Sequence, residues 1–244
     1  MPRFYIPSFA WNPDRLVLDR DEAHHATDVL RMKTGDRATV FNGEGVEAEV
    51  ELLKIGKQGA ELKNISLNKT PALKSKIVLA QAIPKGKNME LIIEKAVELG
   101  VDRVVPMVSE RTIIRGDEND AARKQLKWQR VAVEACKQCG QNWLPKVETP
   151  LAPKAFFDRG EKFDLMLIAS LQNDARPLKA MLAEFGEKRP RSVLVLIGPE
   201  GDFTPAETAL AKSAGCRSLT LGPIILRTET AAIYSISVLG HELF

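Results

Sequence analysis

The sequence contains few of the residues on which metal and redox chemistry depend. Its 244 residues include three histidines and three cysteines, and it has no His-Glu-x-x-His motif. Cys136 and Cys139 have the spacing of a redox pair, but they lie at the end of an expected helix, where the helix dipole raises a thiol pKa. Cys216 is far from both in the sequence. We therefore expect buried, unreactive thiols and no metal site.

Long apolar runs are also absent. None approaches the roughly 20 residues that a membrane helix needs, and the first residues, Met-Pro-Arg-Phe-Tyr-Ile, lack the basic-then-apolar pattern of a signal peptide. An odd number of cysteines without a secretory signal fits a reducing compartment. We expect a cytoplasmic protein without a membrane partner. The formal net charge of +3 permits a nucleic-acid partner without requiring one.

Phosphate-binding glycine motifs are missing as well. Neither Gly-x-x-x-x-Gly-Lys-Ser/Thr nor Gly-x-Gly-x-x-Gly occurs where a strand would lead into a helix. The pair Gly43-Glu-Gly45 has no helical pattern behind it. These absences make an ATP-dependent or dinucleotide-dependent enzyme the weakest hypothesis.

Two apolar runs near the C-terminus each end in a Gly-Pro turn. The run 193–197 is apolar throughout, as in a strand buried on both faces of a parallel sheet, and Gly198-Pro199 follows it. The run 219–221 leads into Gly222-Pro223. Such turns occur in many ordinary strand–helix connections. Because open α/β sheets bind ligands at the carboxyl ends of their strands, two such turns followed by acidic and hydroxyl residues favour a binding site.

The texture of the chain changes near residue 72. Residues 1–72 read as β-rich, with alternating apolar and acidic residues over 46–52 and one helix capped by Asp19. Beyond a linker at 70–76, strands and helices alternate through 73–244, which predicts a second, α/β domain with an open parallel sheet. The expected strands are 77–82, 103–108, 165–169, 193–197 and 219–221. The expected helices are 89–97, 122–139, 177–185, one beginning at a capping box of Thr204 and Glu207, and one beginning near Thr228.

The motifs at the two Gly-Pro turns resemble those of a known family. Ile197-Gly-Pro-Glu-Gly201 and Leu221-Gly-Pro-Ile-Ile-Leu-Arg-Thr-Glu-Thr-Ala231 are similar to the last two motifs of the RsmE family of SPOUT methyltransferases. Pro84-Lys-Gly-Lys, Ser109-Glu-Arg111 and the segment 127–140 resemble its earlier motifs. Two positions depart from the pattern: Asp202 stands in place of a usual glycine, and Ile224 where an arginine is common.

The resemblance implies an activity and an architecture that the residues alone do not give. The activity is S-adenosylmethionine-dependent methylation of the N3 of a uridine in 16S ribosomal RNA. The architecture is a PUA-like RNA-binding β-barrel followed by a SPOUT domain with a C-terminal trefoil knot, assembled as a homodimer that works on the small ribosomal subunit. Ordinary topology rules disfavour knots, so pattern alone predicts an unknotted, doubly wound sheet.

Three polar residues are candidates for catalysis. Arg227 is expected either to stabilise negative charge on the uracil ring or to form an ion pair with Glu200 or Glu229 that joins two loops. Glu200 is either a base, an orienting group or a helix cap. We expect cofactor binding by Leu171, Gln172, Ile197, Gly198, Pro199, Gly201, Leu221, Gly222, Ile225 and Leu226. We expect RNA contacts from Arg3, Arg31, Lys33, Arg111 and Arg115, although a solvated surface would explain most of these cations.

Two alternative functions remain open. A SPOUT enzyme that methylates a ribose 2′-oxygen would carry similar motifs, and nucleoside analysis of its product distinguishes it. A non-catalytic RNA-binding or ribosome-assembly factor would retain the fold but fail to bind S-adenosylmethionine.

Overall fold

A computed structural model describes residues 1–56, 59–112 and 118–244. The chain forms two compact units, one of Met1–Ala72 with Val133–Leu144 and one of Leu73–Ala132 with Pro145–Phe244. Sequence analysis divided the chain at residues 72 and 73 but left Val133–Leu144 in the second domain. No helix of the described ranges is long and apolar enough to cross a membrane.

The first unit is built on a five-stranded sheet in the order β1-β3-β4-β5-β2. Strand β1 pairs in parallel with β3, and the other pairs are antiparallel. The strands are β1 (Arg3–Tyr5), β2 (Leu16–Leu18), β3 (Arg37–Phe41), β4 (Val46–Gly56) and β5 (Gly59–Lys69). In β4 the alternation seen in the sequence buries Ala48, Val50 and Leu52 in the core of this unit.

The expected helix of the first unit forms, but it changes geometry half-way. Helix α1 (Arg20–His24) begins at Asp19, whose Oδ1 accepts the Glu22 N–H at 2.9 Å. A π-helical turn (His25–Val29) then continues it, and Arg31 follows with a positive φ of 57°. These features raise the basic residues after the helix onto an exposed turn.

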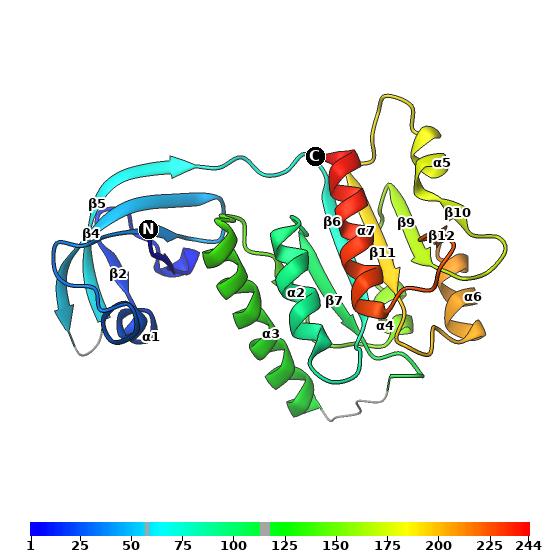
Figure 1. Cartoon of the computed structure of the whole chain (residues 1–244), viewed down its shortest axis with the longest axis horizontal. Helices are drawn as coiled ribbons and strands as arrows, with labels where there is room; N and C mark the ends of the chain where they lie inside the picture. Colours follow the sequence, from blue (N-terminus) through cyan, green and yellow to red (C-terminus); the bar gives the residue numbers. More distant parts are fainter. Residues whose placement is uncertain (57–58, 113–117) are drawn as a thin grey trace. The chain divides into compact units, whose positions relative to one another are not determined.

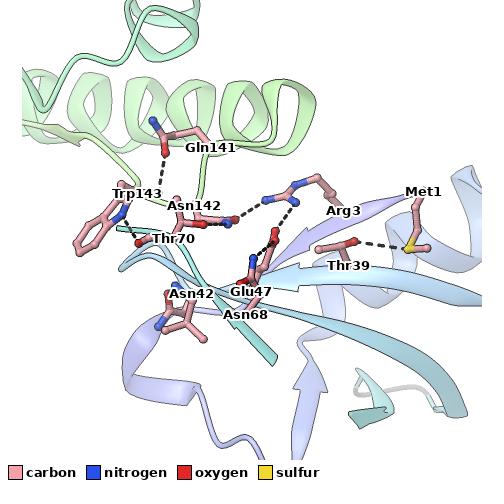
Figure 2. Close-up of polar contacts among 11 residues, drawn as sticks. Met1, Arg3, Thr39, Asn42, Glu47, Asn68, Thr70, Gln141, Asn142 and Trp143 are labelled. Atoms are coloured by element: carbon pink, nitrogen blue, oxygen red, sulfur yellow. Dashed lines mark hydrogen bonds and ion pairs between the residues drawn. The ribbon is translucent and has the colours of Figure 1, made fainter. Parts of the chain in front are cut away.

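A polar network fixes the segment after α3 (Glu118–Cys139) to the strands of the first unit (Figure 2). Arg3 donates to Glu47 at 2.9 Å and to Asn142 at 2.6 Å. Asn142 donates to the Thr70 hydroxyl at 2.8 Å, and the Trp143 indole donates to the Thr70 carbonyl at 3.0 Å. The guanidinium of Arg3 is therefore used inside this unit, where its side chain is 15% exposed.

The second unit contains a wholly parallel sheet in the order β10-β12-β9-β11-β6-β7-β8. The sheet confirms the expected α/β architecture. Its strands are β6 (Lys76–Ala82), β7 (Arg103–Met107), β8 (Lys146–Val147), β9 (Leu165–Ala169), β10 (Arg176–Pro177), β11 (Ser192–Ile197) and β12 (Arg217–Thr220). The edge strands β8 and β10 were not expected, because two residues are too few to show a periodic pattern.

Helices cover this sheet. Besides α3 they are α2 (Asn88–Glu98), α4 (Pro153–Phe157), α5 (Leu178–Ala183), α6 (Pro205–Ser213) and α7 (Thr228–Leu243). Helix α6 begins with the expected capping box between Thr204 and Glu207. Helix α7 packs against α2, β6 and β11 (Figure 1). It buries Ala232, Ile236 and Leu239. The N-terminus of α7 thus lies at the carboxyl edge of the sheet.

Candidate functional site

A cavity of about 470 Å³ opens at the carboxyl edge of the parallel sheet, within the range typical of small-molecule sites. The loops that follow β9, β11 and β12 form most of it, and these three strands are neighbours in the sheet. We call it the strand-end cavity. It is lined by Asn88, Ala169, Ser170, Leu171, Ile197, Gly198, Pro199, Glu200, Asp202, Leu221, Gly222, Ile224, Ile225, Leu226, Arg227, Thr228, Glu229 and Ala231.

Most of the expected cofactor-binding residues line the strand-end cavity. Gln172 and Gly201 do not. All three residues expected to be catalytic, Glu200, Arg227 and Glu229, lie on its wall. Sequence reasoning missed Thr228 and Asn88, which also line the cavity. Asn88, at the start of α2, carried no signal in the sequence.

The wall combines apolar side chains with unpaired backbone groups. Ile224 and Ile225 are 70% and 78% exposed. Within the described part of the chain, the backbone N–H groups of Ile224, Ile225 and Leu226 donate no hydrogen bond. A ligand with a flat apolar portion and polar edges would pack on these side chains and accept from these donors.

The loop at 198–204 is tied to neighbouring loops. Glu200 Oε1 accepts the Lys85 N–H at 3.0 Å, which joins this loop to the one that follows β6. The Arg111 guanidinium donates to the Gly201 carbonyl, which joins it to the loop that follows β7. These contacts hold one wall of the strand-end cavity in place before any ligand arrives.

Asp202 adopts the backbone conformation that a glycine would favour. Its φ is 62°, in the left-handed region, and its Oδ1 accepts the Phe203 N–H at 2.7 Å. Aspartate tolerates this region better than most residues because its short side chain bonds locally. The departure from the family pattern at this position therefore keeps the turn.

The Arg227 side chain lies on the wall of the strand-end cavity and is exposed to solvent. Arg227 is exposed at the N-cap position of α7. In the described residues it forms no ion pair with Glu200 or Glu229. The structural alternative, in which an ion pair of Arg227 joins the two loops, is not realised.

The residues expected to contact RNA differ in their surroundings. Arg31 and Lys33 are exposed on the turn before β3, where the Lys33 N–H donates to Asp36 Oδ2 at 2.7 Å. Arg111 is exposed but shares its guanidinium with Gly201. Arg3 lies inside the polar network of the first unit, so we leave it out of the RNA-contacting set. Arg115 lies outside the described residues.

The expectation of buried thiols holds for two of the three cysteines. All three are free, but Cys139, the last residue of α3, is exposed. Burial raises the pKa of Cys136 and of Cys216 to about 12. Among the described residues, no group of three or more metal-ligating side chains is present.

Comparison with known proteins decides the family. Residues 71–240 match the model of an RNA methyltransferase domain, and residues 18–63 match that of an RNA methyltransferase PUA domain. The chain is 31% identical over 227 residues to ribosomal RNA small subunit methyltransferase E of Bacillus subtilis, covering 91% of this chain and 88% of that one. The chain belongs to this methyltransferase E family. The expected family, with a PUA-like domain before an α/β methyltransferase domain, is confirmed.

Solved structures of relatives agree. The methyltransferase E of Neisseria gonorrhoeae, bound to S-adenosyl methionine, is 30% identical with a TM-score of 0.86, and the match covers 99% of this chain and 98% of that one. The Legionella pneumophila protein Lpg2936, in complex with the bound cofactor SAM, is 34% identical with a TM-score of 0.89, over 98% and 97% of the two chains. The apolar walls and unpaired backbone donors of the strand-end cavity fit this cofactor.

Proposed function

We propose that this protein methylates the N3 of a uridine in 16S ribosomal RNA of the small ribosomal subunit, with S-adenosylmethionine as the methyl donor. One observation carries the proposal. The Gly-Pro-Glu-Gly turn and the Leu-Arg-Thr-Glu-Thr turn meet around a single cavity, at the edge where parallel sheets bind ligands. Relatives named ribosomal RNA small subunit methyltransferase E are similar in sequence to this chain over most of its length.

The wall of the strand-end cavity would hold the cofactor. Four apolar residues of the cavity would wall the adenine: Ile197, Leu221, Ile225 and Leu226. Backbone groups of the loop at 221–227 would bond its polar edges. When bound, S-adenosylmethionine supplies an electrophilic methyl group on its sulfonium. Gln172 and Gly201 do not line the cavity, but each is next in sequence to a residue that does, Leu171 and Glu200. We keep both as expected cofactor-binding residues on that ground.

The polar residues at the mouth of the cavity have separate roles in this proposal. The uracil N3–H loses its proton as the nitrogen attacks, and negative charge spreads over the two ring carbonyl oxygens. Arg227, which is exposed and has no ion-pair partner in the part of the chain that the structure describes, stabilises that charge. Glu229 lies two residues away on the same wall and accepts the N3 proton. Glu200 orients the loop at 198–204 through its bond with Lys85.

RNA binding involves both parts of the chain. We propose that residues 1–72 form the RNA-binding domain and that Arg31 and Lys33 contact phosphates there. Arg111 and Arg115 contribute from residues 73–244, the methyltransferase domain. Phosphate contacts set the affinity, while uridine recognition takes place at the strand-end cavity.

We also propose that the protein acts in the cytoplasm as a homodimer, with its C-terminal segment threaded through a trefoil knot. Exposed apolar side chains support a self-association surface in the second unit. Leu171, Ile224, Ile225 and Tyr234 are 64%, 70%, 78% and 46% exposed.

The test uses radiolabelled S-adenosylmethionine and small ribosomal subunits that lack the modification, followed by nucleoside mass analysis. We expect 3-methyluridine. A 2′-O-methylated nucleoside would instead favour the ribose methyltransferase. If neither assembled subunits nor free ribosomal RNA take up label, although the protein is folded, the assembly-factor hypothesis replaces this one.

A further inference from the structure

A glutamine is buried in the middle of the apolar sheet beneath the strand-end cavity. Gln81 lies on β6, where it is paired with Ile197 of β11 and Pro106 of β7, and it is 0% exposed. The other residues at 77–82 are apolar. A buried amide in such a place requires hydrogen-bond partners, so its partners indicate why a polar side chain is there.

The partners of Gln81 form a directed chain of hydrogen bonds. Its Nε2 donates to Thr228 Oγ1 at 3.0 Å and to the Ala82 carbonyl at 2.8 Å. Thr228 Oγ1 in turn donates to the Gly198 carbonyl at 2.6 Å. A hydroxyl has one proton to give, so a donor from Gln81 leaves that proton directed at Gly198. We call this chain the Gln81–Thr228–Gly198 relay.

The relay ends at the wall of the strand-end cavity. Thr228 and Gly198 both line that cavity, whereas Gln81 does not. Thr228 is the first residue of α7. Its hydroxyl donates to the carbonyl of Gly198, the residue that directly follows β11, and does not cap α7. Its immediate neighbours are Arg227 and Glu229. The relay therefore sets the start of α7 against the end of β11, and with it the places from which Arg227 and Glu229 extend.

The amide of Gln81 includes a buried oxygen atom that opposes folding. Its Oε1 is buried and has no hydrogen-bond partner among the described residues. An unpaired buried acceptor opposes folding, and an apolar side chain of similar length would avoid that cost. Gln81 is present beside the candidate site despite the cost of its unpaired oxygen. This indicates a role for its Nε2 donor.

We propose that Gln81 and Thr228 are positioning residues for methyl transfer. They act by holding Arg227 and the Gly198 turn in register across the strand-end cavity. The inference rests on the proposed function, because its readout is the rate of that reaction. A positioning error of about 1 Å at a reacting group lowers a rate by roughly 100-fold, so the relay is expected to affect turnover more than folding.

The test compares Thr228→Val, which keeps the shape but removes the hydroxyl, with Thr228→Ser, which keeps the hydroxyl. Single-turnover methylation of unmodified small subunits, cofactor affinity and thermal unfolding are measured for each. We expect Thr228→Val to slow the step by about 10- to 100-fold and Thr228→Ser to restore it to within about threefold. If the wild type methylates uridine and Thr228→Val is equally fast, the relay is refuted while the function stands. If the wild type is inactive, the function fails first.

A second variant distinguishes positioning from a purely structural role. Gln81→Met keeps length and volume but removes both polar atoms of the amide. We expect its unfolding temperature to equal or exceed that of the wild type, while its single-turnover rate falls at least about tenfold. A lower unfolding temperature with an unchanged rate would overturn the proposal. The double variant Gln81→Met/Arg227→Ala tests whether the relay acts through Arg227. Gln81→Met is expected to slow the reaction less in Arg227→Ala than in the wild type. Equal slowing in both would show that the relay does not act through Arg227.

Discussion

The backbone N–H of Lys85 donates to Oε1 of Glu200 at 3.0 Å, across 115 positions of sequence. This bond occupies one carboxylate oxygen of Glu200 and links the loop after β6 to the loop after β11. A glutamine would accept the same bond through its own Oε1, but it would not take up a proton at neutral pH. Replacing Glu200 with glutamine therefore distinguishes the two possible roles of this residue, orienting the loop and acting as a base.

We expect Glu200→Gln to retain single-turnover methylation within about threefold of the wild type, because the bond to Lys85 is kept. Glu200→Ala removes the acceptor and is expected to weaken cofactor binding about tenfold. Calorimetric titration with S-adenosylmethionine and single-turnover assays measure both. A Glu200→Gln protein that binds cofactor normally but is slowed about 100-fold would make Glu200 the base.

Arg227→Ala tests charge stabilisation at the uracil ring. The guanidinium is exposed and has no ion-pair partner among the described residues, so its removal leaves no buried charge unpaired. We expect the single-turnover rate to fall by about 100- to 1,000-fold with cofactor affinity and unfolding temperature unchanged. Arg227→Lys keeps the positive charge but loses the planar guanidinium. Its single-turnover rate is expected to lie between those of the wild type and Arg227→Ala. An undiminished rate in Arg227→Ala would exclude the catalytic role.

Asp202 tests how the chain tolerates its departure from the family pattern. Asp202→Ala keeps the left-handed φ of 62° but loses the acceptor for the Phe203 N–H, so we expect it to lower the free energy of unfolding by roughly 1–2 kcal/mol. Asp202→Gly relieves the backbone strain as it removes the bond, and is expected to stay within about 0.5 kcal/mol of the wild type. Urea unfolding measures both. Asp202→Asn, which keeps an acceptor, is the matched control, and equal losses in Ala and Gly variants would contradict this account.

Glu148 gives the second unit a pH-dependent stability. Burial opposes its charge, but hydrogen bonds and charges of Arg159 and Arg103, at 2.6 and 2.9 Å, outweigh burial and lower its pKa from 4.5. A carboxylate with a lowered folded pKa stabilises the fold above its unfolded pKa, and this contribution is lost as the pH falls through the folded value. We expect Glu148→Gln to be less stable than the wild type at pH 7, with the difference shrinking below pH 4.5.

The control for that experiment is Asp158→Asn, which removes an exposed carboxylate paired with Lys154 at 2.7 Å. Its unfolding free energy is expected to stay close to that of the wild type at every pH, because exposed ion pairs contribute little. A difference between Glu148→Gln and the wild type that is constant from pH 7 to pH 3 would contradict the assignment.

Salt dependence tests the basic turn of the first unit. If Arg31 and Lys33 contact RNA phosphates, Arg31→Gln and Lys33→Gln are each expected to reduce the slope of log affinity against log salt by about 0.7–0.9. Filter binding of 16S ribosomal RNA over a range of salt concentrations gives the slope. Lys154→Gln, at an exposed cation already paired with Asp158, is the control. Unchanged slopes in both variants would show that this turn is only solvated.

Local patterns in the sequence were enough to predict the long elements and the sheet edge at which the strand-end cavity opens. The apolar run at 193–197, the capping box at Thr204 and Glu207, and the alternation in β4 each form as expected, because strand burial, helix capping and pleating depend on residues close together in the chain. The two Gly-Pro turns do not follow adjacent strands, because β9 lies between β11 and β12. They line one cavity as a result of this strand order, which local pattern does not report.

Tertiary structure decided the rest. The roles of Arg3, Glu200 and Gln81 depend on partners that are 139, 115 and 147 positions away, and no local pattern reports such contacts. The sequence determined which residues line the carboxyl edge of the sheet, because their spacing follows the strands. Only the fold decided which of those polar groups are already committed to one another and which, like Arg227, remain available to a substrate.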